Sequence, residues 1–195
     1  MKRMLIVAGL SGVLMPALAS AELDYDAFNA GFRTKASNIS TGNYTEFGLG
    51  ITKNIFKIAY LGASYETGTA PSTPSSAETV VHSTTLGAGL HFPLNDDVDI
   101  IIPGHAFQGT DIIPGSSASV NGYDVGAGIR ALIPYGLEGS IVAVYENTSN
   151  DTYSNKDTYV NAQFGFDFTP EILMYAGIDL LRDHQTIDFG LRVYY

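Results

Sequence analysis

Histidines with an acidic or hydroxyl neighbour are the residues of this chain that could perform hydrolysis. Asp183 precedes His184, and Ser83 follows His82. A hydrolase needs a base beside a nucleophile or an acid, and a further group that orients the base. Adjacent residues on a strand point to opposite faces. No second carboxylate pair accompanies Asp183 and His184, and no acidic residue that would orient His82 can be named. We therefore expect no catalysis, with a hydrolase of lipids or peptides as the less favoured alternative.

A larger set of ionisable residues recurs on one face of alternating segments. Its members are Glu46, Asp97, Asp99, His105, Asp124, Arg130, Glu138, Asp167, Asp179, Asp188 and Arg192, with Glu146 and Arg33 close to it. Charges enclosed by protein are costly unless they are paired or wetted. We expect a plug in which acids flank Arg130 and Arg192, and the alternative is a narrow acidic lumen that passes water or small cations.

Metal and cofactor chemistry find little support in the sequence. The Asp and Asn residues of the segment 147–157 match no calcium loop with a defined ligand geometry. We expect neither a metal nor a cofactor.

The end of the chain shows which elements must position these residues. From Gln185 to Tyr195 apolar and polar residues alternate, with one face made of Ile187, Phe189, Leu191, Val193 and Tyr195. A period of two with contrasting faces predicts a strand between an apolar and a polar environment.

The same alternation predicts about ten strands, although eight or twelve are possible. The segments are 23–34, 43–52, 56–66, 80–92, 97–108, 120–132, 136–147, 158–168, 172–181 and 185–195. Their lengths suit tilted strands that cross a bilayer. Pro103 suggests a bulge or a distortion in the fifth, and Val142 and Val144 fall on the otherwise polar face of the seventh.

The connections alternate in length. Short ones are expected at 52–55, 93–96, 133–135 and 169–171, and longer polar ones at 35–42, 67–79, 109–119 and 148–157. Short periplasmic turns opposite longer outer loops are typical of transmembrane barrels.

The first 21 residues are interpreted as a secretory signal peptide, and residues 22–195 as a single barrel domain. Lys2 and Arg3 precede an apolar run, and Ala19 and Ala21 form an A-x-A cleavage site. Without this segment the 10 Lys and Arg become 8 against 20 Asp and Glu, a net charge near -12. Such a chain should not bind nucleic acid through phosphate contacts. The chain has no Cys, which excludes disulfides.

Two further patterns favour a membrane barrel over a soluble secreted barrel or sandwich. Glycines such as Gly48, Gly126 and Gly177 recur on the polar faces, which suits a narrow lumen. Tyrosines near strand ends suggest interfacial girdles, namely Tyr25, Tyr44, Tyr65, Tyr123, Tyr145, Tyr159 and Tyr195.

The ending DFGLRVYY, together with this architecture, resembles the small outer-membrane barrels of Gram-negative bacteria, of the OmpA and opacity type. In that family Gly190, Leu191, Val193 and Tyr195 would form the signal read by the barrel assembly machinery, where the last residue is most often Phe. The resemblance implies the outer membrane as location, and its lipid, lipopolysaccharide and assembly machinery as partners. We expect a structural or surface-interaction role, with a narrow channel as the first alternative, and no surface ligand can be named.

Overall fold

The fold is a closed barrel of ten antiparallel strands. The computed structural model describes residues 25–36, 44–70, 79–113, 116–150, 153–181 and 185–195. The strands are β1 (Ala27–Ala36), β2 (Tyr44–Phe56), β3 (Ala59–Ala70), β4 (Thr79–Asn95), β5 (Val98–Ile113), β6 (Ser116–Ile133), β7 (Leu137–Asn150), β8 (Tyr153–Thr169), β9 (Ile172–Leu180) and β10 (Gln185–Tyr194). Each strand pairs with its neighbours in sequence.

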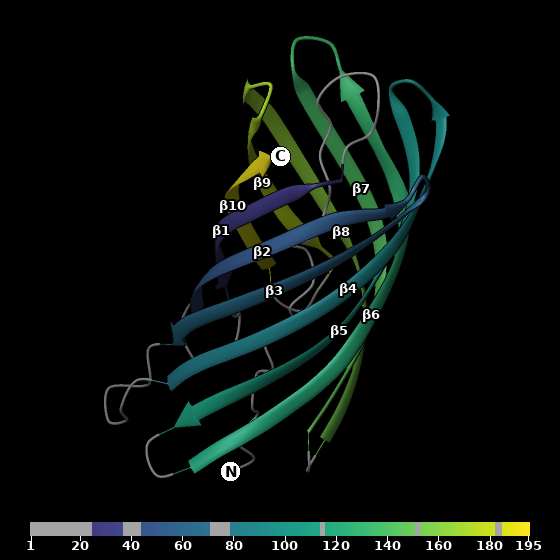
Figure 1. Ribbon diagram of the computed structural model, residues 1–195. Helices are drawn as coiled ribbons and strands as arrows, with labels where there is room; N and C mark the ends of the chain where they lie inside the picture. The colour runs from purple at the N-terminus through teal and green to yellow at the C-terminus, as the bar shows by residue number, and fades with distance from the viewer. Residues whose placement is uncertain (1–24, 37–43, 71–78, 114–115, 151–152, 182–184) are drawn as a thin grey trace.

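The ring closes where β10 pairs with β1 in a continuous register, from Ala27 opposite Tyr194 to Ala36 opposite Gln185. Figure 1 shows these two strands side by side near the C-terminus, with all strands steeply tilted. The predicted all-β, up-and-down barrel with about ten strands is confirmed. Closure leaves no sheet edge unpaired, as a barrel in lipid requires.

The two ends of the barrel differ. At the short-turn end, which also holds the C-terminus, two or three residues join β2 to β3, β4 to β5, β6 to β7 and β8 to β9. At the other, which we call the loop end, seven residues join β1 to β2, eight join β3 to β4 and four join β9 to β10, whereas only two join β5 to β6 and β7 to β8. Residues 37–43, 71–78, 114–115, 151–152 and 182–184 of these links are outside the described residues. The predicted signal peptide also lies outside them.

Two of the predicted long loops are wrong. Residues 109–113 and 116–119 continue β5 and β6, with Thr110 opposite Ser119. Residues 148–150 and 153–157 likewise continue β7 and β8, where Thr148 faces Asn155. The sequence of these segments resembles loops because Ser, Thr and Asn are common in turns. A strand exposed to water can nevertheless pair through its backbone while both of its faces carry polar side chains.

Pro103 does not produce a bulge. Its pairing with Gly89 on β4 is in register. On the β6 side the ladder lacks pairs at Ile102 and Pro103, but the register is the same before and after this gap. The missing proline N–H therefore weakens one ladder locally without shifting the strand.

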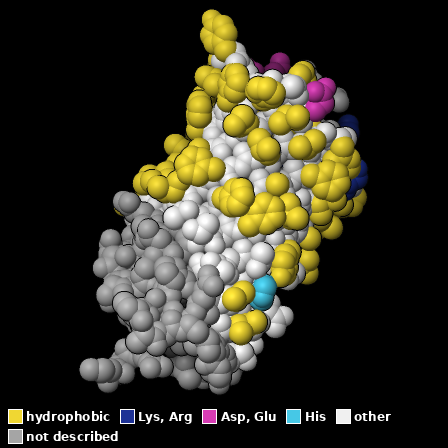
Figure 2. Space-filling model, turned by 90° about the vertical axis from the view of Figure 1, so that its left-hand side faces the viewer, with side chains coloured by type: hydrophobic (Ala, Val, Ile, Leu, Met, Phe, Trp, Pro, Cys, Tyr) yellow, Lys and Arg dark blue, Asp and Glu magenta, His cyan; other side chains and the backbone are white. Residues whose placement is uncertain are grey.

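The outer wall carries an apolar belt. Side chains alternate between buried and exposed along each strand, and β7 is an example with Ile141 exposed and Val142 buried. On β6 the outward apolar positions run from Tyr123 to Ile133, ten residue steps at about 3.4 Å each, or roughly 25 Å of height at a tilt of about 40°. Figure 2 shows hydrophobic side chains spread over this wall, with the visible charges gathered at one edge.

Beyond the belt, at the loop end, the outward positions become polar while the strands continue. On β6 these are Ser117, Ser119 and Asn121, and on β8 Ser154, Lys156 and Thr158. Tyr65, Tyr123 and Tyr145 lie at the boundary, where interfacial aromatic residues are expected. The predicted place of Tyr25 and Tyr159 in the interfacial girdles is wrong. Both are fully buried inside the barrel, because they alternate in step with the inward residues of their segments. The side chain of Tyr44 is not among those described.

The interior is narrow because glycines accept large side chains from neighbouring strands. A Cβ on Gly89 would lie 2.2 Å from the ring of Tyr60, and one on Gly190 would lie 2.4 Å from that of Tyr175. Val142 lies against Gly126 in the same way, and it packs with Ile101, Val144 and Tyr159 in a small apolar cluster. Side chains rather than open space therefore occupy the centre at these levels.

Within the described part of the chain, no helix is long and apolar enough to span a membrane.

Candidate functional site

The predicted ionisable set lies inside the barrel with one exception. The structure buries Glu46, Asp99, Asp124, Arg130, Glu138, Asp179, Asp188 and Arg192. The side chain of His105 is 7% exposed, and Asp167 faces inward at the short-turn end with intermediate exposure. Glu146 and Arg33, placed near the set, are buried as well.

Asp97 is the exception, and its predicted place in the lumen is wrong. The fifth strand starts at Val98, so Asp97 lies exposed in the turn between β4 and β5. Its N–H donates to Asn95 Oδ1 at 2.9 Å. The predicted strand began at residue 97, but the alternation of inward and outward side chains holds only within a strand, and Asp97 belongs to the turn.

The short-turn half of the interior contains an arginine layer, formed by Arg130, Glu138 and Arg192. Arg130 Nε and Nη2 donate to the two carboxylate oxygens of Glu138 at 2.9 and 3.1 Å. Arg192 Nη1 lies 3.8 Å from Glu138 Oε1. Both arginines are 0% exposed, and a bidentate arginine pair combines strength with a fixed geometry.

Amide side chains hold the second arginine of this layer. Arg192 Nε donates to Asn29 Oδ1 at 2.8 Å, and Nη2 donates to Gln163 Oε1 at 3.4 Å. Its guanidinium also lies over the ring of Tyr175, 5.3 Å from the ring centre. One carboxylate thus lies near two arginines, and neutral acceptors bind two further nitrogens of Arg192.

Aromatic side chains continue this packing beside the arginine layer. Tyr25 stacks on Tyr60 with ring centres 5.2 Å apart, and the ring of His91 lies 3.9 Å from that of Tyr25. The hydroxyl of Tyr25 donates to Asp99 Oδ2 at 2.8 Å.

The loop-end half holds an excess of acids. Arg33 Nη1 lies 3.5 Å from Glu66 Oε2, and Arg33 is opposite Glu46 on β2 and Asp188 on β10. Asn161 Nδ2 donates to Asp179 Oδ1 at 2.8 Å. We call this group, made of Arg33, Glu46, Glu66, Asp179 and Asp188, the acidic cluster.

Two further buried carboxylates, Asp124 on β6 and Glu146 on β7, lie beside each other. His105 Nδ1 lies 2.6 Å from Asp124 Oδ1, and Asp124 is opposite Glu146 in the β6–β7 register. Thr148 donates to Glu146 at 3.1 Å. The charge of the described interior is therefore distributed unevenly: Arg130 and Arg192 offset the carboxylates of the short-turn half, whereas Arg33 alone faces six buried carboxylates in the loop-end half.

Several inward residues were missed from the sequence. Glu66 belongs to a segment whose two faces compete, and only its pairing with Gly48 assigns it to the interior. Tyr25 was assigned to a strand end, and Asn29, His91 and Gln163 carry no fixed charge, so the pattern of ionisable residues does not include them. Parity along β1 and β8 places Asn29 and Gln163 on the inner face.

The C-terminal residues take the orientation expected of a final strand. Leu191, Val193 and Tyr195 are exposed on the outer wall, and Gly190 faces inward against Tyr175. Tyr195 packs on Phe28 with ring centres 4.8 Å apart. Their reading by the assembly machinery stays a prediction.

The two dyads considered for hydrolysis do not form a described site. The hydroxyl of Tyr65 lies 2.9 Å from His82 Nδ1 on the outer wall, whereas Ser83 is buried inside. Asp183 and His184 lie outside the described residues. Among the residues that the structure does describe, no three His, Asp or Glu side chains are grouped to hold a metal ion.

Fold and interior together define a class: a closed antiparallel barrel with an apolar outer belt and an interior packed with ionic and aromatic side chains. No family model matches the chain, and no curated protein matches its sequence.

Solved structures of similar shape are barrels of the bacterial outer membrane. The KdgM porin in complex with disordered oligogalacturonate has 10% identity and a TM-score of 0.49, with 87% of this chain and 99% of that chain covered. Neisserial surface protein A has 12% identity and a TM-score of 0.44, with 87% and 95% covered. The β domain of the Bordetella autotransporter BrkA has 13% identity and a TM-score of 0.46, with 87% and 99% covered. These likenesses are distant, and no activity follows from them.

Proposed function

We propose that this protein is an integral outer-membrane barrel, closed to solutes, that performs no catalysis and has a structural or surface-interaction role. The observation that carries the proposal is the arginine layer. Arg130 and Arg192 are both 0% exposed. Protein atoms therefore enclose their guanidinium groups completely. A conducting path needs water at every level of the lumen.

The outer wall supports the location in the membrane. An apolar belt of roughly 25 Å matches the height of the outward band in outer-membrane barrels. Its neighbours would then be membrane lipid, with lipopolysaccharide beside the polar extensions of β6 and β8. The loop end would face the outside and the short-turn end the periplasm, as in barrels with short periplasmic turns. The barrel assembly machinery is the partner proposed for insertion.

Planar-bilayer recording of the refolded barrel tests the closed interior. The unaltered protein should give no steady conductance steps, whereas Arg130→Ala combined with Arg192→Ala should give them, because the arginine layer would lose its bulk. Lys57→Ala, which removes a positive charge from an exposed turn, is the matched control and should stay silent. Slower migration after boiling on a gel verifies that each variant is folded. Steady, salt-dependent steps from the unaltered barrel would refute the proposal.

The second candidate is a narrow path for small cations. The observation in its favour is the acidic cluster, where Arg33 lies 3.5 Å from Glu66 and opposite Glu46 and Asp188 on the two neighbouring strands. A lumen lined by acids favours cations. If steps appear, their reversal potential under a salt gradient should report cation selectivity, and Glu66→Gln with Asp188→Asn should reduce it.

A further inference from the structure

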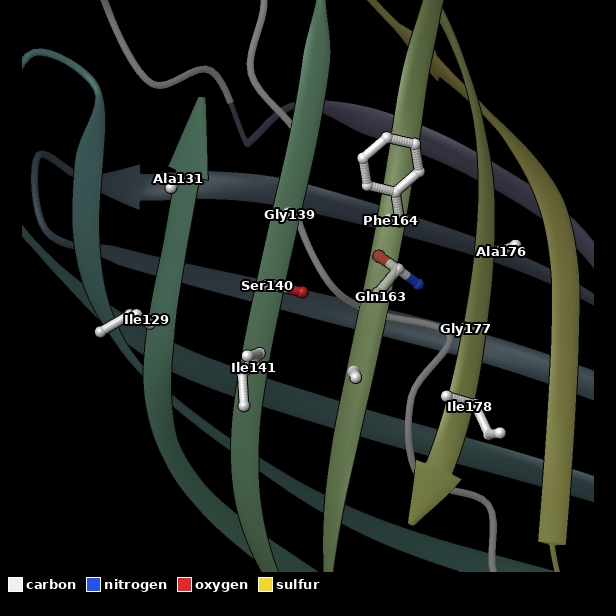
Figure 3. A pocket seen from close by; sticks show the side chains of 11 residues that line it. Ile129, Ala131, Gly139, Ser140, Ile141, Gln163, Phe164, Ala176, Gly177 and Ile178 are labelled. Carbon is white, nitrogen blue, oxygen red and sulfur yellow. The ribbon is translucent and has the colours of Figure 1, made fainter. Parts of the chain in front are cut away.

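The outer wall of β6, β7, β8 and β9 contains a hollow of about 570 Å³ that is separate from the lumen. Its floor is made of small residues, Ala131, Gly139, Ala162 and Ala176, one from each strand (Figure 3). A Cβ added to Gly139 would meet only the tip of Ile133, at 3.7 Å. Missing side-chain volume on the outer face therefore creates the hollow.

Only hydrocarbon faces this hollow. Its walls are the outward side chains of Ile129, Ile141 and Ile178, together with the ring of Phe164, which Figure 3 shows beside them. The two polar residues of the lining, Ser140 and Gln163, are 5% and 7% exposed and turn their side chains into the barrel. A polar solute would find no side-chain partner here.

The hollow lies within the apolar belt and crosses its middle. On β7 the outward belt runs from Leu137 to Tyr145, and the hollow is at Gly139 and Ile141, nearer the short-turn end. On β9 the belt runs from Ile172 to Leu180, and the hollow is at Ala176 and Ile178, nearer the loop end. If the short-turn end faces the periplasm, as the proposed function has it, an acyl chain from the inner leaflet reaches the β7 side of the hollow first. Phospholipid forms that leaflet, and lipopolysaccharide lies in the opposite one.

The size of the hollow argues against a second copy of the chain as its occupant. Its lining contains 11 residues, whereas a stable protein interface uses about 20–30 residues on each side. A chain of methylene groups is thin enough to lie between the isoleucines. In lipid, where the hydrophobic effect provides no drive, tighter van der Waals packing is what distinguishes such a site from flat wall.

We propose that this hollow binds one acyl chain of an inner-leaflet phospholipid and retains that lipid when the remaining bilayer is removed. The proposal rests on the membrane location given under the proposed function. Outward positions on β1, β2 and β10 carry larger side chains, such as Phe28, Ile51 and Leu191.

Native mass spectrometry of the barrel, extracted from membranes in a mild detergent, tests the proposal. The unaltered protein should carry one phospholipid, and the doubly filled variant Ala162→Phe with Ala176→Phe should lose it. The matched control is Ala88→Phe with Ala106→Phe, which adds the same two rings to exposed positions of β4 and β5 outside the hollow. The control should retain the lipid.

Four results would overturn the inference. They are an unaltered barrel without bound lipid, equal retention by the filled variant, a bound mass equal to that of lipid A, and a dimer that the filled variant abolishes. Slower migration after boiling and insertion into phospholipid vesicles are measured on the same samples. They test the barrel in the membrane separately, so the lipid site can fail while the proposed function stands.

Discussion

At the scale of single residues, Glu138 connects the arginine layer, because both arginines of this layer approach its carboxylate. Arg130 binds it through two hydrogen bonds, and Arg192 lies at 3.8 Å. Breaking a buried ion pair by removing one partner usually destabilises a protein by about 3–5 kcal/mol, because the remaining charge has no counterpart. The removal of Glu138 would leave two such charges with fewer partners.

Glu138→Ala should therefore lower the free energy of unfolding by about 3 kcal/mol or more, measured by urea titration of the barrel in phospholipid vesicles. Asp97→Ala is the control, since this exposed turn residue carries the same charge and should change stability by less than about 0.5 kcal/mol. Equal effects of the two substitutions would mean that the arginine layer contributes little to stability.

At the scale of elements, β5 and β6 remain paired beyond the apolar belt, whereas the strands of a shorter barrel would end where the belt ends. Gly109 pairs with Val120, and Thr110 pairs with Ser119, although the side chains around them are mostly polar. Inter-strand pairing in this region must be supported by backbone hydrogen bonds and by the inward side chains of Phe107 and Val120, both 4% exposed.

Hydrogen exchange checks this extension. Amides of residues 109–113 and 116–119 should exchange more slowly than those of an unstructured peptide, because paired N–H groups must open before they exchange. Peptide-level mass spectrometry of the barrel in detergent micelles measures the rates, and the belt segment of β6 from Tyr123 to Ile133 is the protected reference. Exchange at the unstructured rate would restore the interpretation of this segment as a long loop.

The strands could be predicted from the sequence because a period of two is a strong signal wherever the outer wall and the lumen differ sharply in polarity. Phe189 and Val193 face out while Asp188 and Arg192 face in, as the alternation of β10 indicates. The same signal predicted that Val142 and Val144 share the inner face of β7, where they now form part of the apolar cluster.

Strand ends and interior partners could not be predicted with the same security. Past the belt both faces are polar, so no contrast separates strand from loop at Thr110 or Ser119. In the turn at Asp97 the side chains do not alternate between the two faces of a strand, so the sequence pattern does not indicate where this side chain lies. The pairing of Arg130 with Glu138 depends on the register between β6 and β7, which hydrophobic periodicity alone does not specify.

At the scale of the whole molecule, the barrel has an axis with three zones. The polar extension lies at the loop end, the apolar belt in the middle and the short turns at the other end. Inside, the acidic cluster lies toward the first zone and the arginine layer toward the last. If the loop end faces outward, approaching cations meet the acids first, and the arginines then oppose their passage.

The orientation of this axis can be measured with single cysteines, because the chain has none of its own. Asn121→Cys lies on the polar extension, Ile129→Cys in the belt and Asp96→Cys in a short turn, and all three positions are exposed on the outside of the barrel. A membrane-impermeant maleimide added to intact cells should label Asn121→Cys, and should label Asp96→Cys only after the outer membrane is permeabilised. Ile129→Cys should stay unlabelled in both cases, because lipid covers it and a thiolate does not form in hydrocarbon. If Ile129→Cys reacts as fast as Asn121→Cys, the outer wall faces water and the barrel is not a membrane protein, and if Asp96→Cys reacts in intact cells, the axis is inverted.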